Sequence, residues 1–128
     1  MTIQNIKDKL QFRKQTNIDT DRLIEFVNTV EMQIKKEIID THEGAEKYVF
    51  NGYTTDDVEG TQLIAPAPYS EMYVFYVSAQ ISLAENNIAS FNNEMALFNQ
   101  WYGDFTGYYT RNNMPLPKKN MFLRGYNI

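Results

Sequence analysis

The sequence predicts a mainly α-helical bundle, and three observations lead to this prediction. Apolar residues recur every three or four positions over residues 20–41, as they do on one face of a helix. The same spacing runs through residues 74–109 for five repeats of seven residues. The chain contains no cysteine, so its 128 residues must form a core without disulfides or thiolate metal sites.

The first two predicted helices lie in the amino-terminal third. Residues 2–14 place Ile3, Ile6 and Leu10 at helical spacing. A longer amphipathic helix is expected over 20–41, and on its opposite, exposed face Glu31 and Lys35 form an i,i+4 pair. Asp19, Thr20 and Asp21 supply its N-cap and favourable first-turn acids, and Gly44 follows its end. The apolar stripe of this second helix consists of Leu23, Val27, Val30, Ile34 and Ile38.

Residues 45–68 connect the two helical parts. Residues 47–50 have strand propensity, Asn51-Gly52 is the commonest type I′ turn dipeptide, and residues 53–55 could pair back. The sequence therefore predicts a short β-hairpin over 47–55, which would need support from elsewhere in the fold. The acids that follow lack the spacing of a calcium loop, so a solvated turn is expected there. These acids are Asp56, Asp57 and Glu59.

The seven-residue repeat over 74–109 is the most regular pattern in the chain. As one unbroken helix, these 36 residues would be about 54 Å long, which exceeds the width of a small domain. We therefore expect either one long heptad-patterned helix that projects from the domain or a helical hairpin that bends near residues 85–87. The stripe consists of Val74, Val77, Ile81, Ala84, Ile88, Phe91, Met95, Phe98, Tyr102, Phe105 and Tyr109.

The second half of this repeat is rich in aromatic residues and poor in charge. Residues 48–110 contain seven acids and neither Lys nor Arg. Depleted Lys and enriched Tyr, Trp and Met are typical of protein interfaces. We expect Trp101, Tyr102, Phe105 and Tyr108 to pack between elements of this chain or between copies of it. Gly103 and Gly107 would allow another backbone to approach closely.

The carboxyl-terminal end reverses the charge. Residues 111–128 contain four bases and no acid, and Pro115 and Pro117 favour extended geometry. We divide the chain into a helical domain, 1–115, and an extended docking arm, 116–128. The basic arm could bind the acidic middle of a neighbouring copy, head to tail, or a different acidic partner. The residues expected to dock the arm are Lys118, Lys119, Phe122 and Arg124.

The sequence offers little for catalysis. His42 is the sole histidine and has no nucleophile beside it, and the chain contains no Gly-rich phosphate loop, nucleophile elbow or HExxH motif. We expect no enzymatic activity, no cofactor and no metal site. The net charge of −4 disfavours specific nucleic-acid binding. No apolar run approaches the roughly 18 residues of a membrane span, and no signal peptide is recognisable, so neither secretion nor a membrane partner is expected.

Residues 63–115 carry four motifs that occur together: an apolar-Pro-x-Pro-Tyr approach, a Tyr-rich helix entry, an Asn-rich middle followed by Met and Phe, and an aromatic run with a basic-Asn-Met-Pro ending. Their residues are Pro66, Pro68 and Tyr69; Met72, Tyr73 and Tyr76; Asn92, Asn93, Met95 and Phe98; and Tyr102, Phe105, Tyr109, Arg111, Met114 and Pro115. In these 53 of its 128 residues the chain resembles the small head–tail connector (adaptor, head-completion) proteins of tailed phages and prophages of Gram-positive bacteria.

The resemblance implies a structural virion protein that assembles in the host cytoplasm. It would form a ring with its own copies at the head–tail interface, dock on the phage portal protein and contact the next neck or tail-completion protein. Residues 45–62 have no firm counterpart in the family, which leaves their role open. The alternatives are another minor virion protein, for head or tail completion, and a helical partner-binding protein of a prophage that is not part of the virion.

Overall fold

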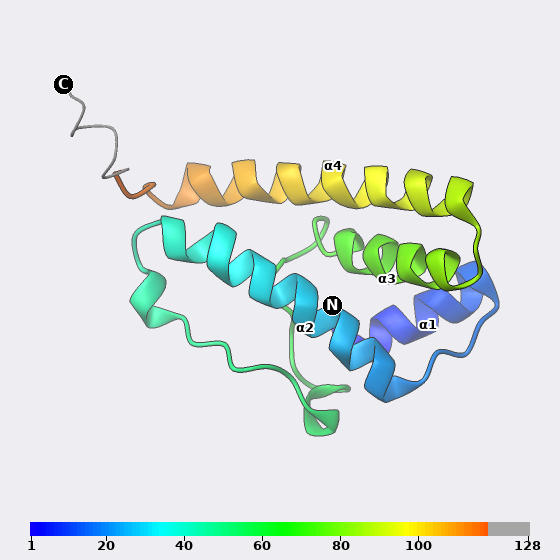
Figure 1. The fold of residues 1–128 in the computed structure, drawn as a ribbon. Coiled ribbons are helices and arrows are strands. Elements are labelled where there is room, and N and C mark those ends of the chain that lie inside the picture. The colour runs from blue at the N-terminus through cyan, green and yellow to red at the C-terminus, as the bar shows by residue number, and fades with distance from the viewer. Residues whose placement is uncertain (118–128) are drawn as a thin grey trace.

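Helix α3 lies at the centre of the structure, and three other helices pack against it (Figure 1). The computed structural model describes residues 1–117. Its helices are α1 (Ile3–Lys14), α2 (Thr20–Glu37), α3 (Glu71–Ala84) and α4 (Ile88–Asn112), and short 3-10 turns occupy Ile39–Thr41, Ala45–Lys47 and Thr55–Asp57. Residues 1–117 contain no β-strand, so the prediction of a mainly helical protein is confirmed.

Helix α1 forms where the sequence predicted a helix. Thr2 Oγ1 accepts a hydrogen bond from the Asn5 N–H at 3.2 Å, and Asn5 Oδ1 accepts one from the Thr2 N–H at 2.9 Å, which together make a capping box. Gln15 then adopts a left-handed backbone with φ 54° and ends the helix. The apolar stripe of α1 is fully buried. It consists of Ile3, Ile6 and Leu10.

Helix α2 ends one turn earlier than predicted, at Glu37 rather than at residue 41. A 3-10 turn takes its place, and the Thr41 hydroxyl donates to the carbonyls of Glu37 (3.0 Å) and Ile38 (2.8 Å). The predicted apolar stripe of α2 is nonetheless fully buried or nearly so, and the helix packs against α1 and α3. The core therefore begins at α2 as the sequence indicated.

Of the two predicted alternatives, the one long heptad-patterned helix is wrong, and the helical hairpin that bends near residues 85–87 is confirmed, with α3 and α4 running antiparallel (Figure 1). Asn86 adopts a left-handed backbone with φ 59°, and the Asn87 N–H donates to the Ser82 carbonyl at 2.9 Å, which closes the turn. At this turn the stripe residues are not all buried, since Ile88 is 51% exposed. Within α3 burial is not confined to one face of the helix. Three consecutive side chains are buried there, because α1, α2 and α4 all pack against α3. These side chains are Met72, Tyr73 and Val74.

The prediction of a β-hairpin over 47–55 is also wrong. A type I′ turn needs positive φ at both central residues, but only Gly52 has it, with φ 100°. Helix α2 binds the expected returning strand in place of a partner strand. Asn28 accepts a hydrogen bond from the Tyr53 N–H at 2.8 Å and donates one to the Tyr53 carbonyl at 3.3 Å.

Glu31 is not the exposed residue that the helical pattern predicted, because its side chain is fully buried. Its carboxylate accepts hydrogen bonds from the Tyr53 hydroxyl (2.6 Å), the Tyr73 hydroxyl (2.6 Å) and the Ile64 N–H (2.9 Å). Tyr73 in turn accepts from the Ala65 N–H at 2.9 Å. Burial raises the pKa of Glu31, and the three donors only partly oppose this rise. This network ties the 53–65 segment to α2 and α3.

A second carboxylate joins α1 to the α3–α4 hairpin. Glu94 of α4 is 8% exposed and accepts hydrogen bonds from Ser78 and from Ser82 (2.6 Å) of α3. Lys14 of α1 lies 3.1 Å from the same carboxylate. Burial alone would raise the pKa of Glu94, but the hydrogen bonds from Ser78, Ser82 and Lys14 outweigh it and hold the pKa below its ordinary value.

The two tyrosines that bind Glu31 differ in burial, and this difference predicts unequal losses. Tyr73→Phe removes the donor to Glu31 and leaves the buried Ala65 N–H without its acceptor, so we expect the free energy of unfolding to fall by about 2–3 kcal/mol. Tyr53→Phe should cost about 1 kcal/mol, because Tyr53 is half-buried and water can replace its hydroxyl. Urea unfolding followed by circular dichroism measures both values. Equal losses would contradict this account.

The two carboxylates also predict opposite pH dependences. The raised pKa of Glu31 means that its contribution to stability is full below the ordinary carboxyl pKa of about 4.3 and is lost as the pH rises through the raised value. The lowered pKa of Glu94 means that its contribution is full above about 4.3 and is lost as the pH falls. The stability difference between wild type and Glu31→Gln should therefore shrink from acid to neutral pH.

For Glu94→Gln the same difference should be largest at neutral pH and shrink in acid. Urea unfolding of the three proteins over a pH series gives both differences. A parallel pH course for the two variants would rule out the opposite environments assigned to these side chains.

Candidate functional site

The best candidate site joins a hollow at the carboxyl-terminal end of α4 to a second hollow that has no α4 residue in its lining, and we call the two together the Tyr48 groove. It consists of two hollows, of about 240 Å³ and 300 Å³, that share Tyr48. The first hollow has no charged residue in its lining. Its lining residues are Ile39, Tyr48, Ile64, Pro66, Phe105, Tyr108, Tyr109, Asn112 and Asn113. The second is lined by Lys47, Tyr48, Val49, Phe50, Tyr53, Thr61 and Gln62.

Three separate elements hold the walls of the groove. The Glu31 carboxylate fixes the backbone of Ile64 and the hydroxyl of Tyr53, so the loop wall is anchored to α2. The Tyr48 N–H donates to the Ala45 carbonyl at 3.0 Å, which places Tyr48 directly after a 3-10 turn. The last turns of α4 form the opposite wall. The groove is therefore built by the tertiary fold and not by one local motif.

His42 fixes the end of α4 against the end of α2. The ring is 5% exposed, and its Nδ1 lies 2.5 Å from the Ile38 carbonyl, to which it donates. Its Nε2 lies 3.0 Å from the Thr110 hydroxyl, and the ring meets Tyr109 edge-on with centroids 5.0 Å apart. Both ring nitrogens of this histidine therefore have hydrogen-bond partners within the fold.

Tyr69 is the centre of the aromatic cluster in which three of the predicted interface residues lie. Its ring centroid is 6.4 Å from that of Trp101, 5.9 Å from that of Phe105 and 5.0 Å from that of Tyr108. Phe105 is buried, at 3% exposed, whereas Trp101 and Tyr108 keep part of their surface in solvent. Phe105 therefore packs between elements, and Trp101 and Tyr108 retain surface that another chain could contact.

The fourth predicted residue, Tyr102, lies apart from this cluster. Its hydroxyl donates to Glu37 at 2.7 Å and links α4 to the end of α2. Burial, followed by the bond and charge of Glu37, raises the pKa of Tyr102. The predicted arm residues Lys118, Lys119, Phe122 and Arg124 lie outside the described residues, so their docking stays a prediction.

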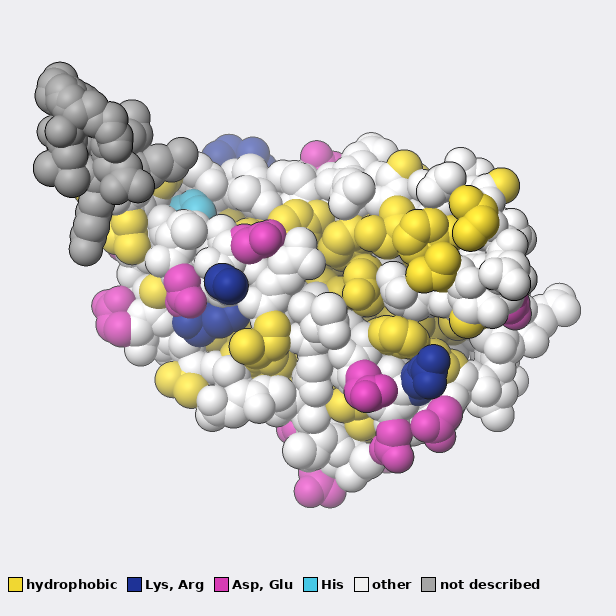
Figure 2. Space-filling model, viewed as in Figure 1, with side chains coloured by type: hydrophobic (Ala, Val, Ile, Leu, Met, Phe, Trp, Pro, Cys, Tyr) yellow, Lys and Arg dark blue, Asp and Glu magenta, His cyan; other side chains and the backbone are white. Residues whose placement is uncertain are grey.

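Aromatic side chains of α2, α3 and α4 contact one another in a row, and Figure 2 shows apolar side chains gathered over α3 and α4. Phe26 of α2 meets Tyr76 of α3 at 6.4 Å, Tyr76 meets Phe98 of α4 at 5.3 Å, and Phe98 meets Tyr102 at 5.6 Å. This row binds three helices together. Leu83 of α3 is a further exposed apolar side chain, at 43%.

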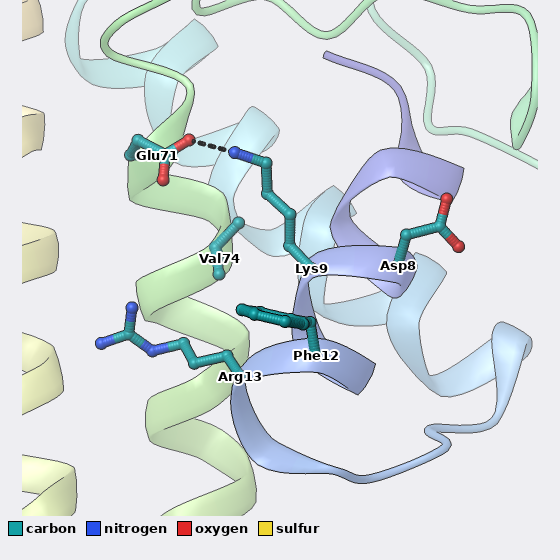
Figure 3. A pocket seen from close by; sticks show the side chains of 6 residues that line it. All are labelled: Asp8, Lys9, Phe12, Arg13, Glu71 and Val74. Carbon is teal, nitrogen blue, oxygen red and sulfur yellow. Dashed lines mark hydrogen bonds and ion pairs between the residues drawn. The ribbon is translucent and has the colours of Figure 1, made fainter.

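A further hollow of about 390 Å³ lies beside α1 (Figure 3). Phe12 extends from α1 toward Val74 of α3 and is 89% exposed. The rim is charged, and Lys9 pairs with Glu71 at 2.9 Å. A hollow with a charged rim is a poorer match to an apolar partner surface than the Tyr48 groove, whose first hollow is uncharged.

Sequence reasoning missed Tyr48, Phe12 and Glu31. Phe12 interrupts the polar face of α1 between Gln11 and Arg13, and an aromatic residue off the apolar stripe is a usable sign of exposure. Tyr48 was assigned to a strand, and its role follows from contacts with α4 that are distant in sequence. Glu31 looks like any surface acid in the helical pattern, so the sequence carries no sign of its burial.

No group of three metal-ligating side chains occurs in residues 1–117, and no helix in that range is long and apolar enough to cross a membrane. Asp57 of the acidic loop instead accepts hydrogen bonds from the Thr54 N–H (2.8 Å) and the Thr61 hydroxyl (3.0 Å). These bonds lower the pKa of Asp57. The Asp57 side chain therefore stabilises the turn of residues 54–61 by hydrogen bonds.

No protein family model, no curated protein and no solved structure matches this chain. The class of protein that the fold defines is therefore a small helical protein with a tyrosine-lined groove. Any more particular role is a matter for proposal.

The difference in burial between Phe105 and Tyr108 separates stability from binding. Phe105→Ala empties a core position, so we expect a loss of about 3–5 kcal/mol in the free energy of unfolding. Tyr108→Ala should cost less than about 2 kcal/mol, because part of its surface is already in solvent. Thermal and urea unfolding measure both variants. If Tyr108→Ala is as damaging as Phe105→Ala, Tyr108 is a core residue and cannot report on binding.

Proposed function

We propose that this chain is a structural virion protein, a phage head–tail connector that forms a ring with its own copies and docks on the portal. The observation that carries the proposal is the Tyr48 groove, whose first hollow is uncharged and presents three tyrosines. Aromatic residues without nearby charges are typical of the centre of protein interfaces. The groove supports a role in binding another protein chain, and the proposal assigns the chain no reaction.

The virion context comes from the resemblance of residues 63–115 to connector proteins. These residues span the α3–α4 hairpin and the prolines that precede it. The motif residues Phe105 and Tyr109 line the groove, so the stretch that carries the resemblance also builds the proposed contact surface. The next neck or tail-completion protein would contact a different face of the same ring.

The outer side of α4 supports contact between copies. No charged residue is exposed on α4 from Ile88 to Gly103, since Glu94 is buried. A Cβ atom at Gly103 would meet no atom within 4 Å, so packing inside this chain does not require glycine there. Glycine in a helix costs about 1 kcal/mol relative to alanine. A neighbouring backbone that approaches this side would explain the residue.

Quantitative mass spectrometry of gradient-purified particles tests the proposal. We expect the wild-type protein in particles of the encoding phage or prophage at a copy number that matches the portal. Tyr108→Glu should remove it from the particles while the portal remains, because the charge disrupts the uncharged hollow. Met32→Glu, at an exposed apolar position on α2, is the matched control and should leave incorporation unchanged.

Absence of the wild-type protein from mature particles would refute the connector role and favour a partner-binding protein of the prophage. Presence at a copy number unrelated to the portal would instead assign the chain to another minor virion component.

A further inference from the structure

We infer that residues 118–128 of one copy bind in the Tyr48 groove of a neighbouring copy. The inference rests on the proposed function, because it names the contact that would join copies in the ring. Four observations carry it: the free backbone at the groove, the charges beside it, the composition and length of the segment outside the described residues, and the direction in which the chain reaches residue 117.

The backbone beside the groove is open for pairing. Residues 49–52 make no backbone hydrogen bond with any other residue of 1–117. The segment is held at both sides, by the Tyr48 N–H to the Ala45 carbonyl and by the pairing of Tyr53 with Asn28. Val49 is 75% exposed and Tyr48 is 40% exposed. A fixed segment with free N–H and C=O groups and apolar side chains suits the addition of an extended peptide.

The charges of the two segments are complementary. Residues 43–62, which contain the groove segment and its flanking turns, carry five acids and one base, although that base, Lys47, is the one charged residue that lines the groove itself. Residues 118–128 carry three bases and no acid. Opposite net charges of this size favour encounter and disfavour like-charged partners.

The segment 118–128 also has the apolar content and length that the groove needs. It contains Met121, Phe122, Leu123, Tyr126 and Ile128 among eleven residues. Fully extended, these eleven residues reach about 36–40 Å. Phe122 has a size that suits the uncharged hollow beside Tyr48.

The direction of the chain favours the groove of a neighbour. The Glu43 N–H donates to the Met114 carbonyl (2.8 Å), and the Leu116 N–H donates to the Thr41 carbonyl (2.8 Å). This antiparallel pairing carries the chain from the level of residue 43 back to residue 41, away from residues 44–52 of the same molecule. Figure 1 shows the described chain leaving α4 at one end while residues 48–53 run away from that end. Reaching its own groove would require the segment to reverse.

Such a contact is heterologous, since the segment of one copy meets the groove of the next. Heterologous contacts repeat from copy to copy and close into a ring when the rotation allows it. This geometry agrees with a neck ring.

Two full-length variants test the inference by sedimentation velocity. Phe122→Glu disables the segment, and Val49→Lys disables the groove at an exposed position where folding should be unaffected. Wild type should associate beyond dimers as concentration rises, and more weakly at high salt. Each variant alone should associate at least about tenfold more weakly. Circular dichroism checks the helical content of both, and Met32→Lys, an exposed apolar position on α2, should behave as wild type.

Mixing the two variants gives the decisive result. Val49→Lys retains an intact segment, and Phe122→Glu retains an intact groove, so the mixture should form heterodimers that stop at two chains. A mixture that stays monomeric would overturn the inference, as would a monomeric wild type at every concentration tested. Variants that associate as wild type does would place the contact on another surface and also overturn it.

Failure here and failure of the proposed function are distinguishable. A protein present in particles at the copy number of the portal but monomeric in solution would keep the connector role and lose this contact. A protein that forms the predicted heterodimers but is absent from particles would keep the contact and lose the connector role.

Discussion

The buried carboxylate of Glu31 is the interaction on which the arrangement of the fold depends. Taking an ionised carboxylate out of water costs several kcal/mol, and hydrogen bonds from donors to a charged group return about 1.5–3 kcal/mol each. Three donors from Tyr53, Ile64 and Tyr73 therefore come close to offsetting the cost, and the raised pKa shows that the balance still leans against charge. The network holds a long connection without regular structure against α2 and α3. It adds to the other contacts of this segment with the helices, which include the pairing of Asn28 with Tyr53 and the hydrogen bond from the Gln4 N–H to the Val58 carbonyl.

The same anchoring positions the candidate site. Ile64 is fixed by Glu31, and Tyr48 lies in the groove between Ile64 and the end of α4. Glu94 acts at the other end of the hairpin, where it joins α3 and α4 to Lys14 of α1. One carboxylate lacks a cation and the other has one, so a change of pH acts on them in opposite directions. Neutral donors to Glu31 thus hold the loop, and an ion pair between Glu94 and Lys14 helps to hold the hairpin, around a core that is otherwise apolar.

The sequence predicted correctly those helices whose formation depends on the spacing of nearby residues. The stripe of Ile3, Ile6 and Leu10 and the start of α2 follow from spacing, which needs no knowledge of the rest of the chain. Asp19 is the N-cap residue of α2 as predicted, but its side chain makes no capping hydrogen bond. The predictions that were wrong depended on distant contacts. The Asn51-Gly52 dipeptide favours a hairpin. In the structure Tyr53 instead forms hydrogen bonds with Asn28 and Glu31 of α2, so it does not pair with residues 47–50. The heptad spacing continues through the turn at Asn86, so spacing alone could not distinguish one long helix from a hairpin, and the packing of α3 against α4 decides between them. Among the site residues, aromatic content pointed to the carboxyl half of α4, but only the tertiary structure separates buried Phe105 from accessible Tyr108 and adds Tyr48.

The loop that builds the groove is held in place by the fold and yet has unpaired backbone groups, two properties that a free segment would not combine. Ordering a backbone residue costs about 1–2 kcal/mol, so an exposed segment with unpaired groups is ordinarily disordered and pays this cost when it binds. Residues 49–52 are flanked by the Tyr48 and Tyr53 anchors, so part of that cost is met by the fold before any partner arrives. A peptide that adds to this segment gains hydrogen bonds without ordering both sides. An anchored segment with free backbone groups is therefore a better binding surface than the β-hairpin predicted from the sequence, in which the same groups would already pair with each other.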